Sequence, residues 1–349
     1  MIIRDGLEYS VVALLLTVTA ACARSSGSAA NARLVEQARV SMGSELRVSI
    51  WTPDEAAATR AASAVFTEFD RLESLMSVWR QGSDIQRLNA AAGGSAVAVS
   101  PDVIAVLQDA RQISEWTGGR FDVTFGALSD LWRFDHDQDN SIPDMNEVRR
   151  RLPLIDYRAL EIDERAGTAR LARAGMRAHL GGIGKGFAID KGVAILRRAG
   201  FRDFMIQSGG DLYAAGLKDG KPWRVGVQDP RGPAGQTFAT VDLSDSTFST
   251  SGDYERSFMK DGRRYHHIID PKSGLPAQGC RSVTILAPNA TLADGLSTGV
   301  FLLGPAEGMA LVNRVAGVDA LIVSSANEVL ATPRLKSRLV LMAAPTDAP

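Results

Sequence analysis

The composition indicates a globular protein with little net charge. The chain has 349 residues, of which 45% are hydrophobic, and its 39 lysines and arginines almost balance its 40 aspartates and glutamates, for a formal net charge of -1. This hydrophobic content supplies a core for one large domain or two closely packed ones. A near-zero charge predicts no binding of nucleic acid, because such binding needs clustered basic side chains against the phosphates. A local cation or a backbone nest can still bind a small anion.

The N-terminus predicts export and a lipid anchor. The apolar run at residues 11–21 has the length of a signal-peptide hydrophobic region and is too short to span a bilayer. Cys22 follows small residues in a pattern that resembles a bacterial lipobox, although Thr19 stands where leucine is usual. We therefore expect a signal peptide over residues 1–21, a lipidated Cys22, and a flexible tether over residues 22–40 on the periplasmic side of the inner or outer membrane of a bacterial envelope. The alternative is a buried N-terminal element that happens to contain a cysteine.

After the tether, the patterns predict an α+β domain over residues 41–340. A strand is expected at 45–51, where polar and apolar residues alternate, and capped amphipathic helices are expected to begin near Thr52 and at Ser100. Beyond Arg177 the chain is richer in glycine and in short β-rich runs, and several helices alternate with them. These runs are residues 204–207, 223–227, 265–269, 282–286 and 320–323. Their short connections leave little room for crossover helices, so we expect largely antiparallel sheets flanked by helices.

A glycine cluster at residues 180–187 opens a predicted helix that runs to Arg198. Glycines let backbone N–H groups approach an anion, and Lys185 lies among them, so the segment indicates phosphate or diphosphate binding at a helix N-terminus. It is not a Walker A loop, because Gly186 replaces the serine or threonine that would follow the lysine. The competing interpretation is a flexible turn with a solvated lysine.

The segment from Thr291 to Thr298 has two interpretations. Thr291 and Asp294 have the spacing of a capping box at the start of an apolar helix. Asp294 and Thr298 also lie one helical turn apart on the same face. A carboxylate and a hydroxyl so placed suit Mg²⁺, which takes few protein ligands and completes its octahedron with water and substrate phosphates. Taken alone, the spacing favours capping over metal binding.

Two further segments carry polar residues in less specific patterns. The strand predicted at 265–269 contains His266 and His267, whose side chains should point to opposite faces, and it runs into a turn at Asp270. One histidine with Asp270 can supply a base, or Asp270 can simply start the turn. The segment at 119–126 places an aromatic residue and an acid after a helix stop, and alone it indicates no function.

Together these segments resemble, in order and wording, the ApbE family of FAD:protein FMN transferases. The resemblance also includes residues 41–44, 75–79, 83–85 and 88–89 and so covers nearly all of the mature chain. It implies an ApbE, T-fold-like domain and a Mg²⁺-dependent transfer of the FMN moiety of FAD to a threonine or serine of an acceptor protein, with release of AMP. Acceptors would be flavoprotein subunits of membrane redox complexes or secreted electron carriers. Two alternatives stay open: an FAD pyrophosphatase that releases FMN and AMP, and a non-catalytic flavin-binding lipoprotein.

The resemblance also implies which residues bind the substrate and the metal. FAD would be bound by Met42, Trp79, Arg120, Phe121, Asp122, His179, Lys185 and Ile268. Mg²⁺ would be held by the side chains of Asp294 and Thr298 and by the backbone carbonyl of Gly182. Lys185 would neutralise the diphosphate.

The resemblance also implies two candidates for the catalytic base, and the sequence departs from the family pattern at one position. His267 is the family's His-Ile-Ile-Asp-Pro histidine and the first candidate for the base, and Asp270 is the second. His266 falls at a variable position, so we expect a surface or packing role. His179 stands where many family members have an aspartate, and a histidine cannot supply the same permanent negative charge, so contacts to the adenine or ribose should be altered.

Overall fold

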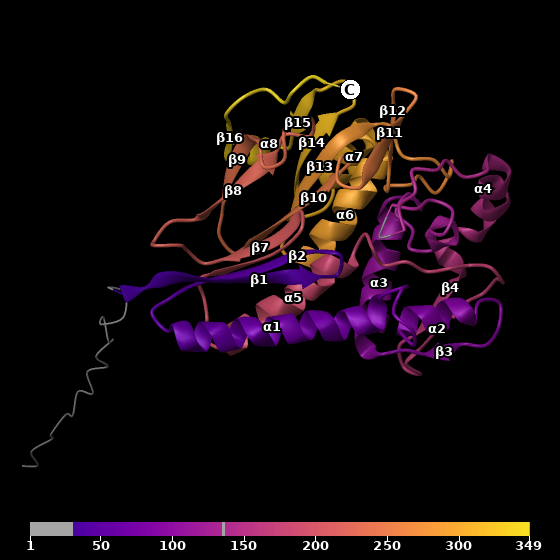
Figure 1. Cartoon of the computed structure of the whole chain (residues 1–349), viewed down its shortest axis with the longest axis horizontal. Helices are drawn as coiled ribbons and strands as arrows, with labels where there is room; N and C mark the ends of the chain where they lie inside the picture. Colours follow the sequence, from indigo (N-terminus) through magenta and orange to yellow (C-terminus); the bar gives the residue numbers. More distant parts are fainter. Residues whose placement is uncertain (1–30, 135–136, 349) are drawn as a thin grey trace, which may run out of the picture.

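The computed structural model describes residues 31–134 and 137–348, and its centre is an eight-stranded antiparallel sheet (Figure 1). The strands lie in the order β1 (Arg33–Ser41), β2 (Ser44–Thr52), β6 (Phe204–Ser208), β7 (Asp211–Ala215), β10 (Ser246–Gly252), β13 (Cys280–Leu286), β14 (Asp319–Ser324) and β15 (Val329–Ala331). Every neighbouring pair in this sheet is antiparallel, as the sequence predicts.

Three smaller sheets surround the central one. They are formed by β16 (Leu339–Leu341), β9 (Thr237–Leu243) and β8 (Trp223–Gln228); by β3 (Val97–Ala98), β5 (Thr168–Leu171) and β4 (Leu160–Asp163); and by the hairpin of β11 (Ser257–Lys260) and β12 (Arg263–His266). Four of the five predicted β-rich runs coincide with strands. The fifth, at 265–269, is only partly a strand, because β12 ends at His266 and, of the three residues that follow, only Ile269 pairs, in an isolated bridge with Pro276.

The helices predicted from apolar spacing are present. Among the described residues the helices are α1 (Glu55–Met76), α2 (Asp84–Ala90), α3 (Pro101–Trp116), α4 (Met145–Arg151), α5 (Gly184–Arg198), α6 (Ala290–Leu303), α7 (Pro305–Val312) and α8 (Pro333–Lys336), with short 3₁₀ turns η2 (Gly126–Leu128), η3 (Leu152–Leu154) and η4 (Tyr157–Ala159). The sequence predicted α1, α3, α5 and α6 individually. The α1 N-cap is Asp54, which accepts a hydrogen bond from the N–H of Ala57 at 2.9 Å. Ser100 caps α3 in the same way.

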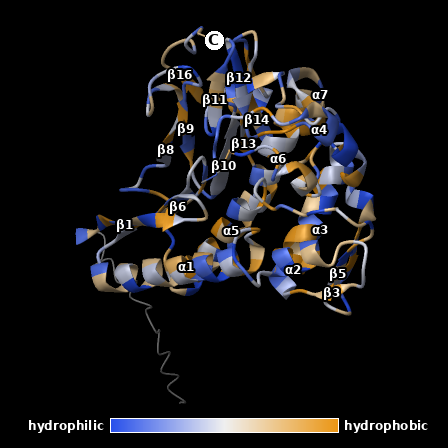
Figure 2. Cartoon of the chain, turned by 45° about the vertical axis from the view of Figure 1, so that its right-hand side comes forward, coloured by the Kyte–Doolittle hydropathy of each residue, from blue (hydrophilic) through white to orange (hydrophobic). Residues whose placement is uncertain are grey.

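The described residues form three hydrophobic clusters. Two lie on opposite faces of the central sheet, and a smaller third one includes Leu128, Trp132 and Val148. In β7, Tyr213 and Ala215 face the main core, to which α1, α5 and α6 contribute, whereas Leu212 and Ala214 face a second core shared with the β8–β9–β16 sheet. Strand alternation accounts for this division, because successive side chains point to opposite faces. Helix α1, which contributes to the main core, carries both hydrophobic and hydrophilic residues along its length (Figure 2).

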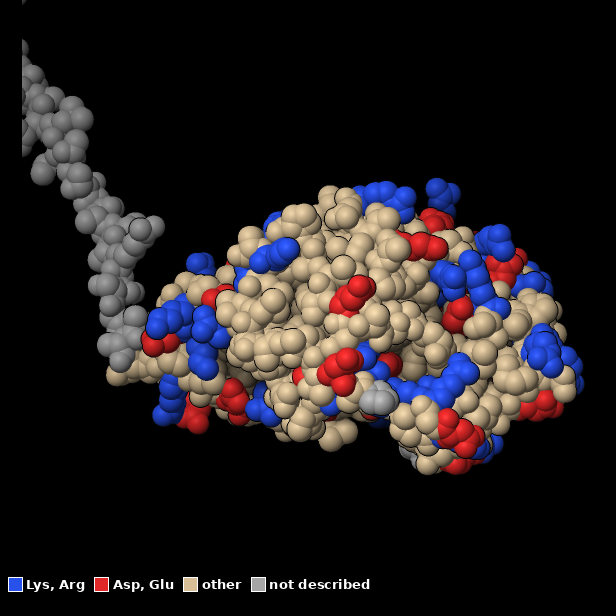
Figure 3. All heavy atoms as spheres, turned by 90° about the horizontal axis from the view of Figure 1, so that it is seen from above, with Lys and Arg blue, Asp and Glu red and all other residues tan. Residues whose placement is uncertain are grey.

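Surface charge, helix hydrophobicity and the extent of β1 can each be compared with the predicted anchor. On the face shown in Figure 3, Lys and Arg side chains are interspersed with Asp and Glu. In the part of the chain that the structure describes, no helix is long and apolar enough to cross a membrane. The predicted tether at 22–40 extends too far, because Arg33–Ser41 pairs with β2 along its whole length. The predicted signal peptide and Cys22 lie outside the described residues.

Candidate functional site

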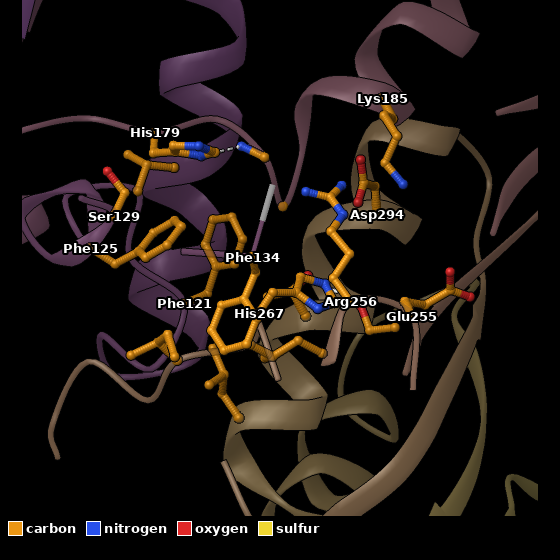
Figure 4. Close-up of a pocket in the computed structure, with 18 of the residues that line it drawn as sticks. Phe121, Phe125, Ser129, Phe134, His179, Lys185, Glu255, Arg256, His267 and Asp294 are labelled. Atoms are coloured by element: carbon orange, nitrogen blue, oxygen red, sulfur yellow. Dashed lines mark hydrogen bonds between the residues drawn. The ribbon is translucent and has the colours of Figure 1, made fainter. Parts of the chain in front are cut away.

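Two adjoining cavities meet at the start of α5. The smaller, of about 310 Å³, is also lined by α6 and by the ends of β7 and β10, and the larger, of about 620 Å³, by the end of α1 and the turn between β1 and β2. The smaller contains most of the residues predicted to act on the substrate, several of which are drawn in Figure 4. The two cavities share Gly43, Phe134, His179, Gly181, Lys185 and Arg256. One ligand with two ends could therefore occupy both and pass Lys185 on the way.

Helices α5 and α6 are held together at the site by a buried carboxylate. The backbone N–H of Gly186 donates a hydrogen bond to Oδ2 of Asp294 at 2.8 Å. A Cβ at Gly186 would lie 2.2 Å from the carbonyl oxygen of Ala290, so only glycine lets the two helices approach this closely. The glycine cluster thus serves helix packing as well as access to the cavity.

The capping-box interpretation of Thr291 and Asp294 is wrong. The N-cap of α6 is Asn289, whose side chain accepts from the third residue of the helix at 2.8 Å. The Thr291 hydroxyl instead donates to Asp190 of α5 at 2.6 Å, and the Asp190 carboxylate also accepts the backbone N–H groups of Ala290 and Thr291, both at 2.8 Å. Asp294 is therefore released from capping and points toward α5.

A lysine and two carboxylates form the charged centre of the smaller cavity. The ammonium of Lys185 lies 2.5 Å from Oδ2 of Asp211, whose other oxygen accepts from the hydroxyl of Ser249. Burial disfavours the charge on Lys185, but Asp211 and then Asp294 outweigh it and raise its pKa. Burial, followed by repulsion from Asp211, raises the pKa of Asp294 to about 8. The cluster thus stabilises an additional positive charge, whether a proton or a cation.

The three groups predicted to hold a metal lie together. Asp294 and Thr298 face the smaller cavity from α6, and both line it with Gly182. A Cβ at Gly182 would lie 3.2 Å from Oγ1 of Thr298, so the glycine leaves a small space beside that hydroxyl. The hydroxyl of Ser251 lies 3.3 Å from Oγ1 of Thr298. These are hard oxygen donors of the kind that Mg²⁺ prefers.

The residues described contain no group of three or more His, Cys, Asp or Glu side chains that could hold a metal by themselves. Magnesium does not require such a group, because it usually keeps several waters and takes one or two carboxylates plus substrate phosphates. The oxygen donors at this site therefore fit Mg²⁺ and do not fit zinc, which prefers nitrogen and sulfur ligands.

The two neighbouring histidines have different surroundings. His267 lines the smaller cavity, and its Nδ1 is buried with no hydrogen-bond partner among the described residues. Burial, and then the charge of Arg256, lowers the pKa of His267 to about 3, so its imidazole is neutral. His266 is buried, its Nε2 lies 2.8 Å from the carbonyl oxygen of Ala277, and its ring packs edge-on against Phe301. The predicted packing role of His266 is confirmed, and the surface alternative is wrong.

Arg120 and Asp270 join two motifs that are far apart in the sequence. Nη1 of Arg120 donates to Oδ2 of Asp270 at 2.9 Å, and both side chains are largely buried. Asp270 also accepts from the backbone N–H of Lys272 at 3.0 Å, so it starts the turn as well. Asp270 therefore starts the turn and also holds Arg120 against the cavity, whether or not it acts as a base.

Phe121 and Asp122 line the smaller cavity, but the Asp122 carboxylate is occupied by its own loop. It accepts from the N–H and hydroxyl of Thr124 at 2.8 and 2.6 Å and from the N–H of Tyr157 at 2.7 Å. Burial raises the pKa of Asp122 although these hydrogen bonds favour its charged form. Its contribution to the site is to fix the loop that presents Phe121.

His179 supports the glycine loop. Its Nδ1 accepts a hydrogen bond from the backbone N–H of Gly181 at 3.0 Å, and its ring tilts against Phe125 with 5.4 Å between centroids. Ile268 is buried and lines the smaller cavity. His179 and Ile268, both predicted to bind the substrate, therefore line the same cavity.

Met42 and Trp79 line the larger cavity rather than the smaller one. Met42 and Gly43 form the tight turn between β1 and β2 with φ of 49° and 73°, the positive values typical of a two-residue hairpin. Trp79 is 49% exposed, which leaves its indole face accessible from solvent. The predicted binding residues are thus divided between two adjoining spaces.

Sequence reasoning missed Asp211, Arg256 and an aromatic wall formed by Phe125, Trp132 and Phe134. Asp211 had a signal, because it follows two glycines directly after a predicted strand. Gly210 there approaches the carbonyl oxygen of Thr250 so closely that a Cβ would lie 2.9 Å from it. Arg256 lies in a charged loop with no distinguishing pattern.

Known proteins resemble this chain over most of its length. The FAD:protein FMN transferase of Treponema pallidum is 36% identical over 333 residues, which cover 90% of this chain and 91% of that protein. A Klebsiella pneumoniae protein with the same name is 31% identical over 85% of this chain and 92% of its own length.

Solved structures agree with these sequence relationships. The ApbE protein of Thermotoga maritima superposes with a TM-score of 0.81 at 30% identity, covering 88% of this chain and 99% of that chain. The flavin transferase ApbE of Vibrio cholerae gives a TM-score of 0.79 at 27% identity, with the same coverage of 88% and 99%. The profile of the ApbE family matches residues 42–322. The expected family and fold are therefore confirmed, and the chain belongs to the ApbE family.

Proposed function

We propose that this protein transfers the FMN moiety of FAD to a threonine or serine hydroxyl of an acceptor protein in a Mg²⁺-dependent reaction that releases AMP. The observation that carries the proposal is the convergence of Asp294, Thr298 and Gly182 beside Lys185, where two cavities adjoin. Relatives over most of the chain are named FAD:protein FMN transferase, which supports the same reaction.

Mg²⁺ would be held by the carboxylate of Asp294, the hydroxyl of Thr298 and the carbonyl of Gly182. When bound, it would offset charge on the phosphate oxygens and help to align the diphosphate. The raised pKa of Asp294 supports this assignment, because a buried carboxylate beside Asp211 is stabilised by a cation.

The chain's own residues orient the substrate for attack. Lys185 lies at the junction of the cavities, where its charge can meet the diphosphate between the two halves of FAD. The acceptor hydroxyl oxygen attacks the FMN-side phosphorus and forms the new P–O bond. The bond from that phosphorus to the bridging oxygen breaks, and AMP leaves with that oxygen and the electron pair. Such a reaction depends mainly on positioning and charge stabilisation.

His267 would accept the proton of the acceptor hydroxyl. Its imidazole is neutral, and its Nδ1 has no hydrogen-bond partner among the residues described, so it is available for this role. The anionic diphosphate would offset the charges of Arg256 and Lys185, both of which lower the pKa of His267, and would make it a stronger base. Asp270 is the weaker candidate, because its carboxylate is already occupied by the ion pair with Arg120.

Two adjoining cavities suit a substrate with two ring systems. Arg120, Phe121 and Ile268 line the smaller cavity, and Trp79 offers a flat face in the larger one. His179 lines both, and its Nδ1 accepts a hydrogen bond from the backbone N–H of Gly181, so it supports the glycine loop. Direct contacts to the nucleotide at this position would then be made by other groups.

Export and anchoring remain part of the proposal. A signal peptide over residues 1–21 and a lipidated Cys22 would hold the enzyme on the periplasmic side of a membrane of the bacterial envelope. Its acceptors would be flavoprotein subunits of membrane redox complexes or secreted electron carriers. FAD would then have to be supplied outside the cytoplasm.

The test is to incubate the purified protein with FAD, Mg²⁺ and a threonine-bearing acceptor, and to measure both AMP release and the mass of the acceptor. Transfer predicts AMP together with a covalent flavin adduct on the acceptor. AMP with free FMN and no labelled acceptor would instead identify a pyrophosphatase, and the absence of both products would identify a binding protein.

Asp294→Ala should abolish the Mg²⁺-dependent release of AMP. Glu115→Ala, which removes an exposed carboxylate on α3, is the matched control and should behave like the unaltered protein. If Asp294→Ala retains Mg²⁺-dependent release of AMP, the metal assignment is wrong.

A further inference from the structure

Arg256 lies at the junction of the two cavities and lines both of them, as Lys185 does. Figure 4 shows its side chain extending from the neighbourhood of His267 toward Asp294 and Lys185. Any ligand that occupies both cavities must therefore pass close to this guanidinium group.

The loop that carries Arg256 is fixed by a buried ion pair. Between β10 and β11, Asp253 is held by both terminal nitrogens of Arg231, at 2.7 and 2.8 Å, and the two side chains are only 10% and 7% exposed. The N–H of Asp253 also donates to the carbonyl of Arg281 at 3.0 Å. A bidentate pair removed from water in this way fixes the orientation of both partners.

The other end of the loop is fixed against the proposed base. The carbonyl oxygen of Arg256 accepts a hydrogen bond from the N–H of His267 at 3.1 Å. Because both ends are held, the Arg256 side chain projects from a constrained backbone. The backbone at Arg256 is therefore set before a ligand binds, which reduces the reorganisation needed to place its guanidinium in the transition state.

The charge of Arg256 acts on the groups around it. It lowers the pKa of His267 and also opposes the charge on Lys185, so its guanidinium lies near both. Lys185 is already paired with Asp211 at 2.5 Å, which offsets much of its charge. The diphosphate of FAD carries two negative charges, and more negative charge develops on the bridging oxygen as the P–O bond breaks. A second cation in contact with the diphosphate would meet that demand.

We infer that Arg256 is a catalytic residue that binds the diphosphate of FAD and stabilises the charge on the leaving oxygen. The inference rests on the proposed FMN transfer. The bond between the FMN-side phosphorus and the bridging oxygen breaks, its electron pair stays on that oxygen, and AMP carries it away. The N–H groups of Arg256 donate to this oxygen and to the adjacent phosphate oxygens, for which a planar guanidinium is suited. The hydroxyl proton of the acceptor goes to His267.

The first test measures recognition of phosphate, independently of catalysis. Titrations of the full protein compare AMP with adenosine and FMN with riboflavin, for the unaltered chain, Arg256→Gln and Arg263→Gln. Arg263 is exposed on the neighbouring hairpin and serves as the matched control. Arg256→Gln should lose at least about tenfold of the preference for the phosphorylated ligand in one of the two pairs. Unchanged preferences in both pairs would overturn the inference.

The second test measures turnover at saturating FAD. Removal of a preorganised donor to a developing negative charge should lower kcat by about 100-fold or more. Arg256→Lys keeps the charge without the planar fork and should recover part of the lost phosphate preference and rate. It also replaces Arg256→Gln in both tests if that variant does not fold. A kcat of folded Arg256→Gln within threefold of the unaltered protein would refute the catalytic role. If only Arg256→Lys folds, an unchanged kcat together with an unchanged phosphate preference would refute it.

The two proposals fail in different ways. If the unaltered protein labels no acceptor but Arg256→Gln still loses the phosphate preference, FMN transfer is wrong and the diphosphate contact is right. If the unaltered protein labels the acceptor and Arg256→Gln does so equally well, the role of Arg256 is wrong and FMN transfer is right.

Discussion

Replacing Gly186 with alanine tests whether the contact between α5 and α6 creates the site. The added Cβ would lie 2.2 Å from the carbonyl oxygen of Ala290 and 2.7 Å from the Cβ of Asp294. Ordinary contact distances require the helices to separate by about 1 Å. That movement also stretches the 2.8 Å hydrogen bond from the Gly186 N–H to Asp294.

These contacts give the expected loss in the free energy of unfolding of Gly186→Ala. Overpacking a close contact costs about 1–3 kcal/mol, and weakening a hydrogen bond to a buried carboxylate adds about 1.5–3 kcal/mol if it is lost completely. The better helix propensity of alanine returns at most about 1 kcal/mol. A net loss of about 2–4 kcal/mol in the free energy of unfolding follows, or a fall of about 4–8 °C in Tm for a domain of this size.

Urea unfolding and Mg²⁺-dependent FMN transfer should both be measured, with Gly184→Ala as the control. At Gly184 the nearest atom to an added Cβ is the Cβ of Leu180 at 3.8 Å, an ordinary contact, so that variant should retain its stability. Gly186→Ala should be less stable and should need more Mg²⁺ for half-maximal transfer. Equal stability and an unchanged Mg²⁺ requirement would refute the idea that this close approach positions Asp294.

Three further substitutions separate the roles of neighbouring groups. Asp190→Asn weakens the charged acceptor for the first turn of α6, so the free energy of unfolding in urea should fall by about 1–3 kcal/mol. An unchanged urea midpoint would contradict the idea that Asp190 holds α6 against α5. The pKa of His267 is about 3 in the folded protein, below its value of about 6.5 in the unfolded chain. As the pH drops below about 6.5, His267 takes up a proton more readily in the unfolded chain, so the folded state becomes less stable. His267→Gln should remove about 2 kcal/mol of the loss between pH 6 and pH 4, whereas parallel stability curves for the two proteins would contradict the low pKa. Asp270→Asn releases Arg120, so it should raise the KM for FAD while lowering kcat less than His267→Gln does, and the reverse order of kcat would make Asp270 the base.

Local patterns predicted most of the fold because the decisive signals lie within a few residues. Ser100 caps α3 as predicted, α1 is capped by Asp54, two residues after the predicted start at Thr52, and the short β-rich runs became antiparallel strands. The boundary at 41 was wrong, since the alternation that continues back through Arg33–Ser41 belongs to an edge strand and not to a tether. The strand predicted at 265–269 ended early at His266.

The site was predictable only where its residues belong to a recognisable motif. The local spacing of Thr291 and Asp294 predicted a cap, but Asn289 took that role and Asp190, from a distant part of the chain, engaged the threonine. Partners of this kind are invisible to a pattern that spans one helical turn. Asp211 and Arg256 were missed for the same reason, because their importance comes from which residues the fold places beside them.

The hairpin of β1 and β2 has a mechanical consequence for the proposed N-terminal anchor. The pairing runs from Arg33 opposite Thr52 to Ser41 opposite Ser44, and the turn at Met42 beside the larger cavity lies at the far end. A pull on the preceding chain perpendicular to β1 would open these pairs one at a time and would reach Met42 last. A pull along the strand would instead load every pair together, which resists force better. The edge strand would therefore absorb tension transmitted by the proposed anchor while the substrate site keeps its shape.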